Sequence, residues 1–203
     1  MLIDKNVRRS CNAGYLFLLD IYYSLGIDKI CAEISEKYKF EYDLNEILSM
    51  LVCSRIIAPG SKRSSLEEAN GFMEQPKCSL HQIYRALEVI AKENDFFQSQ
   101  LYKNSQSITE RRKDVLYYDC TNYYFEIEDE DDFRKYGVSK EHRPNPIVQM
   151  GLFIDSDGIP LSFSVFDGNF SEQPSMTPLE KKILQDFDTS DFVVCTDSGL
   201  SSI

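Results

Sequence analysis

The chain has 203 residues, of which 42% are hydrophobic and 27% charged, an ordinary composition for a globular protein long enough to bury a core. Its formal net charge of −11 argues against nucleic-acid binding by the chain as a whole, because phosphate binding depends on Lys and Arg. No apolar run approaches the roughly 20 residues of a membrane span, and no signal peptide is visible. We therefore expect no membrane association and a cytoplasmic location.

The charge is distributed unevenly along the chain. Residues 1–113 contain 16 basic and 15 acidic side chains, whereas residues 114–203 contain 6 and 18. The acidic excess therefore belongs to the second part, and it is densest at residues 126–132, where we predict a solvated loop.

The cysteines do not indicate a metal site. None of the six forms a C-x-x-C pair, and the two histidines lie far apart in the sequence. Because Cys53, Cys120 and Cys195 lie inside apolar runs, we expect them to be small buried hydrophobic residues. We predict neither a disulfide nor a zinc site.

The first part of the chain is predicted to be helical. Apolar residues recur at helical spacing on both sides of a break at Gly26. Asp43 is placed to cap a helix over residues 44–57, and Ser79 is placed to cap another over residues 80–90.

A further helix is expected from about Asn94 to Arg112. A predicted loop containing Lys62 and Arg63 lies between the two capped helices. This arrangement fits either a helix-turn-helix-like DNA contact or a plain helical bundle. We therefore describe residues 1–113 as a helical N-terminal domain that is a candidate for DNA binding.

The second part is rich in β-branched and aromatic residues, which favour strands. An Asp-Gly pair at residues 157–158 between apolar runs indicates a hairpin. The last strand is almost wholly apolar and is expected to be buried on both faces. The predicted elements are strands at 115–125, 147–154 and 159–166, a helix at 178–187 and a strand at 192–196.

This order of three strands, a helix and a strand is how a ribonuclease-H-like fold begins. In that topology the first and fourth strands are neighbours, so Asp119 in the first and Asp197 after the fourth could share a Mg²⁺ ion. Asp119 as an outward-facing strand residue and Asp197 as a helix N-cap is the other interpretation. The predicted class is α+β: a helical domain, then an incomplete ribonuclease-H-like α/β domain (β-β-β-α-β) at residues 114–203.

Three stretches of the second part resemble a known family. They are Tyr117-Tyr-Asp-Cys-Thr-Asn-Tyr-Tyr-Phe125, then Gly137-Val-Ser-Lys-Glu-His-Arg-Pro-Asn-Pro146 leading to Phe166-Asp-Gly-Asn169, and Val193-Val-Cys-Thr-Asp-Ser-Gly-Leu200. In order and spacing they are similar to the DDE transposases of bacterial insertion sequences, in the superfamily named for insertion sequence four. The resemblance covers about residues 115–203.

The resemblance implies metal-dependent cleavage and transfer of DNA strands at insertion-sequence ends, with Mg²⁺ or Mn²⁺ and with self-association of the full-length protein. Asp119 and Asp197 would be the first two catalytic, metal-binding residues. The family's third residue is a Glu further along, whereas the highest-numbered Glu here is Glu180. We therefore expect an N-terminal fragment of a transposase, inactive by itself.

A basic loop follows the acidic run. Lys140 and Arg143 could hold DNA phosphate, with His142 nearby, although lone basic residues often serve only to keep a loop solvated.

Two other functions stay open at this point. The chain could be a catalytically dead remnant that binds DNA or protein. It could also be a haloacid-dehalogenase-like phosphatase, because Leu152-Phe-Ile-Asp-Ser-Asp-Gly158 resembles that nucleophile motif. The strand predicted to start at Ile159 favours a hairpin instead.

Overall fold

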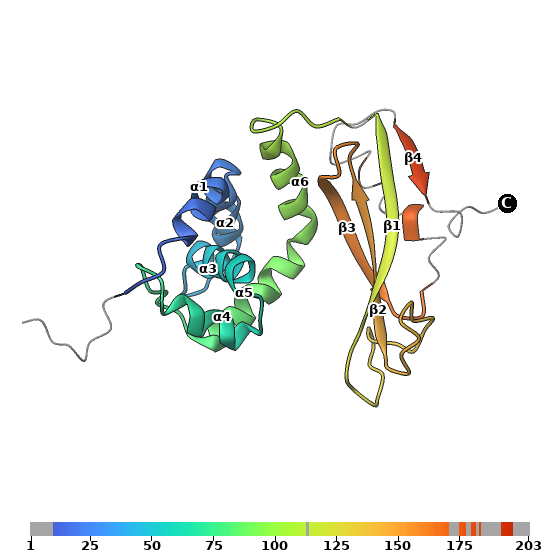
Figure 1. Ribbon diagram of the computed structural model, residues 1–203, viewed down its shortest axis with the longest axis horizontal. Coiled ribbons are helices and arrows are strands. Elements are labelled where there is room, and N and C mark those ends of the chain that lie inside the picture. Colours follow the sequence, from blue (N-terminus) through green and yellow to red (C-terminus); the bar gives the residue numbers. More distant parts are fainter. Residues whose placement is uncertain are drawn as a thin grey trace, which may run out of the picture. The chain divides into compact units, whose positions relative to one another are not determined.

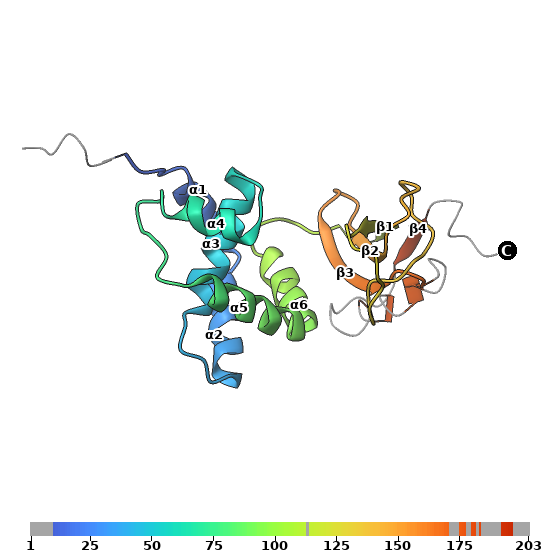
Figure 2. The same ribbon diagram turned by 90° about the horizontal axis from the view of Figure 1, so that it is seen from below.

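The computed structural model describes residues 10–112, 114–170, 175–177, 180–181, 183 and 192–196. The chain divides into two compact units, Met1–Asn104 and Ser105–Ile203. Figures 1 and 2 show helices in the first unit and a small mixed sheet in the second. This arrangement confirms the predicted α+β class. None of the described helices is long and apolar enough to cross a membrane.

The helices of the first unit enclose a single hydrophobic core. Side chains from five of them are almost fully enclosed there, among them Tyr22, Ile30, Ile34, Ile47 and Ile83. The helices are α1 (Tyr15–Ser24), α2 (Ile27–Lys37), α3 (Leu44–Ile57), α4 (Lys62–Ala69), α5 (Leu80–Lys92) and α6 (Asn94–Ser105).

The predicted helix boundaries are confirmed at three places. Gly26 separates α1 from α2 with a φ of +62°, which glycine adopts at little cost. The Asp43 carboxylate accepts the backbone N–H of Glu46 at 3.0 Å and so caps α3. Ser79 and Gln82 form a reciprocal capping box at the start of α5.

Two predicted features of this unit are wrong. Lys62 and Arg63 lie in the first turn of α4, not in a loop, because the Ser61 side chain caps that helix. The last helix ends at Ser105 instead of continuing to Arg112.

The second unit is built on a four-stranded sheet in the order β3-β2-β1-β4 (Figure 1). β1 pairs antiparallel with β2 and parallel with β4, and β2 pairs antiparallel with β3. The first and fourth strands are therefore neighbours, as predicted. The hairpin at Gly158, with its φ of +79°, is also confirmed. The strands are β1 (Val115–Tyr124), β2 (Ile147–Ile154), β3 (Pro160–Asp167) and β4 (Val193–Thr196).

The two faces of the sheet differ. Leu116, Tyr118 and Phe153 are buried on one face, whereas the opposite face leaves Tyr117 and Val193 partly open to solvent. The alternation follows from the two-residue period of a strand. Ile183 is helical and fully buried, although most of the helix predicted at residues 178–187 lies outside the described residues.

The expected burial of β4 on both faces is wrong. Val193 and Cys195 are exposed, while Val194 and Thr196 are half-buried. The strand alternates because no element in the described part of the chain covers its outer face. Cys53 and Cys120 are buried as predicted.

Candidate functional site

Asp119 lies on the open face of the sheet, near the middle of β1. Its side chain is 76% exposed, and its Oδ1 accepts the backbone N–H of Cys120 at 2.8 Å. The residues on either side of it, Tyr118 and Cys120, are buried because strand side chains alternate. A buried strand therefore holds an exposed carboxylate at a defined position.

A shallow depression adjoins this carboxylate. Asp119 lines it together with Tyr117 from β1, Leu152 and Ile154 from β2, and Cys195 from β4. Its walls are mainly apolar, so Asp119 is the charged group of the depression.

The pairing of β1 with β4 is described up to Tyr118 and Thr196. Asp119 is the next residue of β1, and Asp197, which follows Thr196, lies outside the described residues. Within the described ranges, no group of three or more His, Cys, Asp or Glu side chains could hold a metal ion. The Asp119 carboxylate is an oxygen ligand of the type that Mg²⁺ and Mn²⁺ prefer, so it fits as one ligand of such a site.

Lys140 lies beside Asp119. Its Nζ donates a hydrogen bond to the Cys120 carbonyl oxygen and is 3.8 Å from Asp119 Oδ1. The backbone also contacts the strand, because Lys140 N–H donates to Asn122 Oδ1 and Asn122 Nδ2 donates to the Val138 carbonyl, both at 3.4 Å. The structure thus brings together two residues that the sequence singled out separately.

Arg143 lies nearer the end of β1. Its guanidinium carbon is 4.7 Å from the centroid of the Tyr124 ring, and its Nε is 3.5 Å from Glu141 Oε2. The loop turns around buried Ser139, whose carbonyl accepts the N–H of His142 and whose hydroxyl accepts the N–H of Arg143. His142 has a φ of +54° and is exposed.

A small polar cluster supports β1 from the buried face. The hydroxyls of Tyr118 and Ser175 are 2.6 Å apart, and Cys120 Sγ lies 3.2 Å and 3.3 Å from the same two oxygens. A Cβ on Gly151 would lie 2.2 Å from the Tyr118 hydroxyl, so Gly151 makes room for that ring. The cluster fixes the strand on either side of Asp119.

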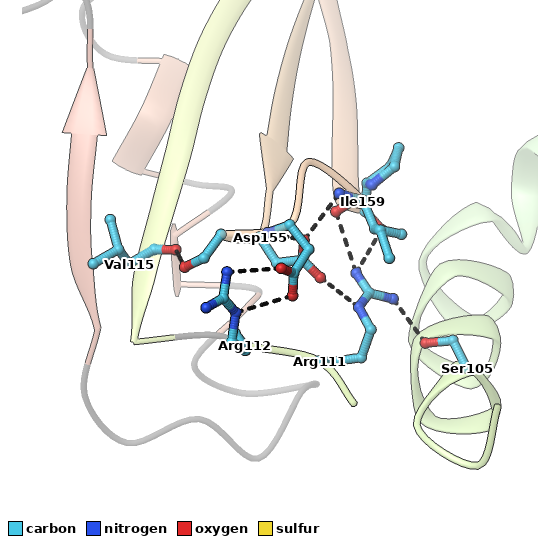
Figure 3. Close-up of polar contacts among 9 residues, drawn as sticks. Ser105, Arg111, Arg112, Val115, Asp155 and Ile159 are labelled. Atoms are coloured by element: carbon cyan, nitrogen blue, oxygen red, sulfur yellow. Dashed lines mark hydrogen bonds and ion pairs between the residues drawn. The ribbon is translucent and has the colours of Figure 1, made fainter. Parts of the chain in front are cut away.

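A buried ion pair lies at the start of the sheet (Figure 3). Arg111 Nε is 2.6 Å from Asp155 Oδ2, and the two side chains are 3% and 0% exposed. Asp155 Oδ1 also accepts the backbone N–H groups of Asp157 and Ile159 at 3.0 Å and 2.9 Å. The carboxylate is therefore fully engaged inside the β2–β3 hairpin.

The same hairpin is held by further contacts, which Figure 3 shows. Arg111 donates to the Ser105 hydroxyl at 2.7 Å and to the carbonyl of Pro160 at 2.9 Å. Arg112 binds Asp157 through two hydrogen bonds of 3.1 Å and 2.7 Å. We name these contacts, together with the Arg111–Asp155 pair, the hairpin clamp.

The hairpin clamp was not predicted from the sequence. The sequence pattern that could have indicated it is a pair of adjacent arginines before the first strand together with two aspartates in the hairpin turn. It also weighs against a phosphatase, because Asp155 is buried against Arg111 and is followed by an antiparallel strand.

No protein-family model and no curated protein matches the chain. Among solved structures, the Mos1 transposase paired-end complex with the left transposon end is similar with a TM-score of 0.27 and 8% identity. The match covers 77% of this chain and 53% of that one, so this chain corresponds to about half the length of the Mos1 chain. A TM-score this low carries no argument about fold or function.

Proposed function

We propose that the chain is the N-terminal part of a DDE-type DNA transposase of the insertion-sequence-four superfamily. The observation that carries the proposal is the parallel pairing of β1 with β4, described up to Tyr118 and Thr196. Asp119 is the next residue of β1, and in the sequence Asp197 follows Thr196, the last residue of β4. A register continued by one residue would place the two carboxylates opposite each other.

Asp119 and Asp197 would hold Mg²⁺ or Mn²⁺ through carboxylate oxygens. Such ions supply activation of the attacking oxygen and stabilisation of the leaving oxygen in phosphodiester cleavage. The exposure of Asp119 supports this role, because a carboxylate that binds metal and DNA must be reachable from solvent. The resemblance also implies a third carboxylate, a Glu, and no Glu follows Asp197 within the 203 residues.

Lys140 and Arg143 would contact DNA phosphate next to this carboxylate. The Lys140 ammonium is held between Asp119 and the Cys120 carbonyl, and the Lys140 side chain is 48% exposed, so a phosphate oxygen can reach it. Arg143, stacked on Tyr124, presents a second cation further along the strand. The partners proposed for the complete protein are insertion-sequence ends, target DNA and a second transposase copy.

Metal binding tests the carboxylate pair without requiring catalysis. Titration calorimetry with Mn²⁺ on the full chain should show binding that Asp119→Asn and Asp197→Asn each weaken at least about tenfold. Asp167→Asn is the matched control, an exposed aspartate at the end of β3. Equal Mn²⁺ affinity in wild type and in all three variants would contradict the proposed pair and favour a remnant that only binds DNA or protein.

Strand cleavage tests the activity itself. The protein should be produced with any coding sequence that continues beyond residue 203, and incubated with plasmid carrying the element's ends. We expect cleavage with Mg²⁺ or Mn²⁺ that is lost in Asp119→Asn. If the extended protein cleaves equally well with that substitution, Asp119 is not a catalytic residue.

A further inference from the structure

A second candidate site lies in the helical unit, on the exposed side of α5. His81, Arg85, Glu88 and Lys92 form one stripe along this helix, because they are spaced three or four residues apart. The stripe forms one wall of a groove, and residues 38–42, which connect α2 to α3, form the other wall. Figure 2 shows this connection passing beside α5.

The second wall is aromatic. The rings of Phe40 and Tyr42 are stacked, with centroids 4.4 Å apart and planes within 6° of parallel, and Tyr38 stacks on Phe40 at 6.2 Å. All three rings are half-buried, so part of each faces the solvent. The Tyr38 hydroxyl donates to Glu93 at 2.8 Å, which anchors the start of the segment. The aromatic wall is therefore held in place before any ligand arrives.

The groove carries more cations than carboxylates. Lys92 pairs with Glu88 at 2.8 Å. The pKa of Glu88 is lowered mainly by Lys92 and also by the nearby charge of Arg85. In the described part of the chain, no carboxylate lies within salt-bridge distance of Lys39. Three cations and two carboxylates line the groove, with His81 in addition, in a chain whose net charge is −11. A local positive balance against this background indicates an anionic ligand.

We propose that this groove binds single-stranded nucleic acid. An excess of cations beside partly exposed aromatic rings matches a ligand that has both phosphates and flat bases, since sequence-independent single-strand sites combine a positive groove with stacking platforms. Lys39 and Arg85 would contact phosphates, His81 would donate a further hydrogen bond, and Tyr42, the end ring of the stack, would contact a base. This site requires neither Asp119 nor a metal ion.

Fluorescence anisotropy of labelled oligodeoxyuridylate and oligouridylate, with the full chain at low salt and with a chelator present, tests the proposal. We expect dissociation constants on the order of 10 µM. Equal affinity for the two oligonucleotides would mean that the groove recognises phosphate and base alone. A preference for one of them would mean that it also recognises the sugar. Affinity weaker than about 100 µM for both would overturn the proposal.

Two variants with the same loss of charge locate the site. Lys39→Ala/Arg85→Ala should weaken binding at least about tenfold and reduce the slope of log affinity against log salt by about 1.4, or 0.7 for each lost phosphate contact. Lys29→Ala/Arg55→Ala, at exposed positions of α2 and α3 outside the groove, should change affinity less than about twofold. An equal loss in both variants means that only net charge matters, and the proposal fails.

The aromatic wall needs a separate variant. Tyr42→Leu should weaken binding about tenfold while leaving the salt slope unchanged, because stacking does not release counterions. Circular dichroism shows whether each variant keeps its helices. Competition by polyglutamate as strong as by oligonucleotide, or clearly tighter binding of random duplex DNA, would contradict a single-strand site.

Discussion

At the scale of single residues, the stability of the fold depends on the buried ion pair of Arg111 with Asp155. The Arg111 side chain is 3% exposed and is bound to the fully buried side chain of Asp155. Arg111→Met would leave the Asp155 charge buried without its cation, so we expect unfolding free energy to fall by about 3–5 kcal/mol. Urea denaturation of wild type and variant measures the difference.

Arg112 provides the matched comparison, since it is the next residue and also pairs with an aspartate. Its side chain is 58% exposed, so water replaces the lost contacts in Arg112→Ala. We expect a much smaller loss than for Arg111→Met. A similar loss in both would show that burial is not what makes the Arg111 pair matter. The double variant Arg111→Met/Asp155→Asn should regain part of the stability, because the orphaned charge is gone.

We expect Cys31 to make the stability of the fold depend on pH. Burial raises the pKa of its thiol from 9.0 to about 11, and a hydrogen bond with Tyr22 opposes this shift. As pH rises, the thiol therefore ionises in the unfolded chain before it ionises in the folded chain. The stability that the buried neutral thiol gives to the fold is complete below pH 9 and is lost as pH rises towards 11. The unfolding free energy should fall by roughly 3 kcal/mol over this pH interval. Urea midpoints should converge between wild type and Cys31→Ala over that interval, and parallel curves would contradict the assignment.

At the scale of elements, Gly151 decides how β1 and β2 pack. An added methyl group would meet the Tyr118 hydroxyl at 2.2 Å, on the strand that carries Asp119. We expect Gly151→Ala to lower the thermal midpoint through overpacking of about 1–3 kcal/mol. Gly158→Asn is the control, because Asn tolerates a positive φ and no atom lies within 4 Å of a Cβ there. A midpoint shift no larger than the control's would show that Tyr118 can move aside.

Elements with strong local signals were predictable from the sequence. The Asp43 and Ser79 caps and the Asp-Gly hairpin act within a few residues, so their helices and strands were placed nearly correctly. α4 was missed because its eight residues are mostly polar and begin after Pro59 and Gly60. The helix that ends at Ser105 was extended too far, since periodicity alone gives no stop signal there.

The candidate site was predictable only in part. Lys140 and Asp119 were both singled out, but a loop's path over a strand depends on contacts such as those of Asn122, which no local pattern encodes. The Arg111–Asp155 pair joins residues 44 positions apart, so only the folded chain reveals it. The exposure of Cys195 depends on what covers β4, which local composition cannot indicate.

At the scale of the whole molecule, the two units have separate cores. The buried residues of the helical core all lie between Tyr15 and Val89. We therefore expect Ile34→Ala to speed hydrogen exchange in peptides of the helical unit by destabilising it about 2–5 kcal/mol, and to leave the strands unchanged. Arg111→Met should do the reverse. Exchange followed by mass spectrometry distinguishes the units, and uniform acceleration in either variant would mean that they unfold together.

The hairpin clamp also bears on how this protein can be engineered. Surface turns between strands are usually the safest places to insert a tag or a fluorophore. Here the turn residue Ser156 binds the Val115 carbonyl at the start of β1, and Asp157 binds the Arg112 guanidinium just before that strand. An insertion at this turn would break the contacts that hold the start of β1 in place. A label intended to leave the sheet intact should therefore be placed elsewhere, for example in the exposed acidic loop near Asp129.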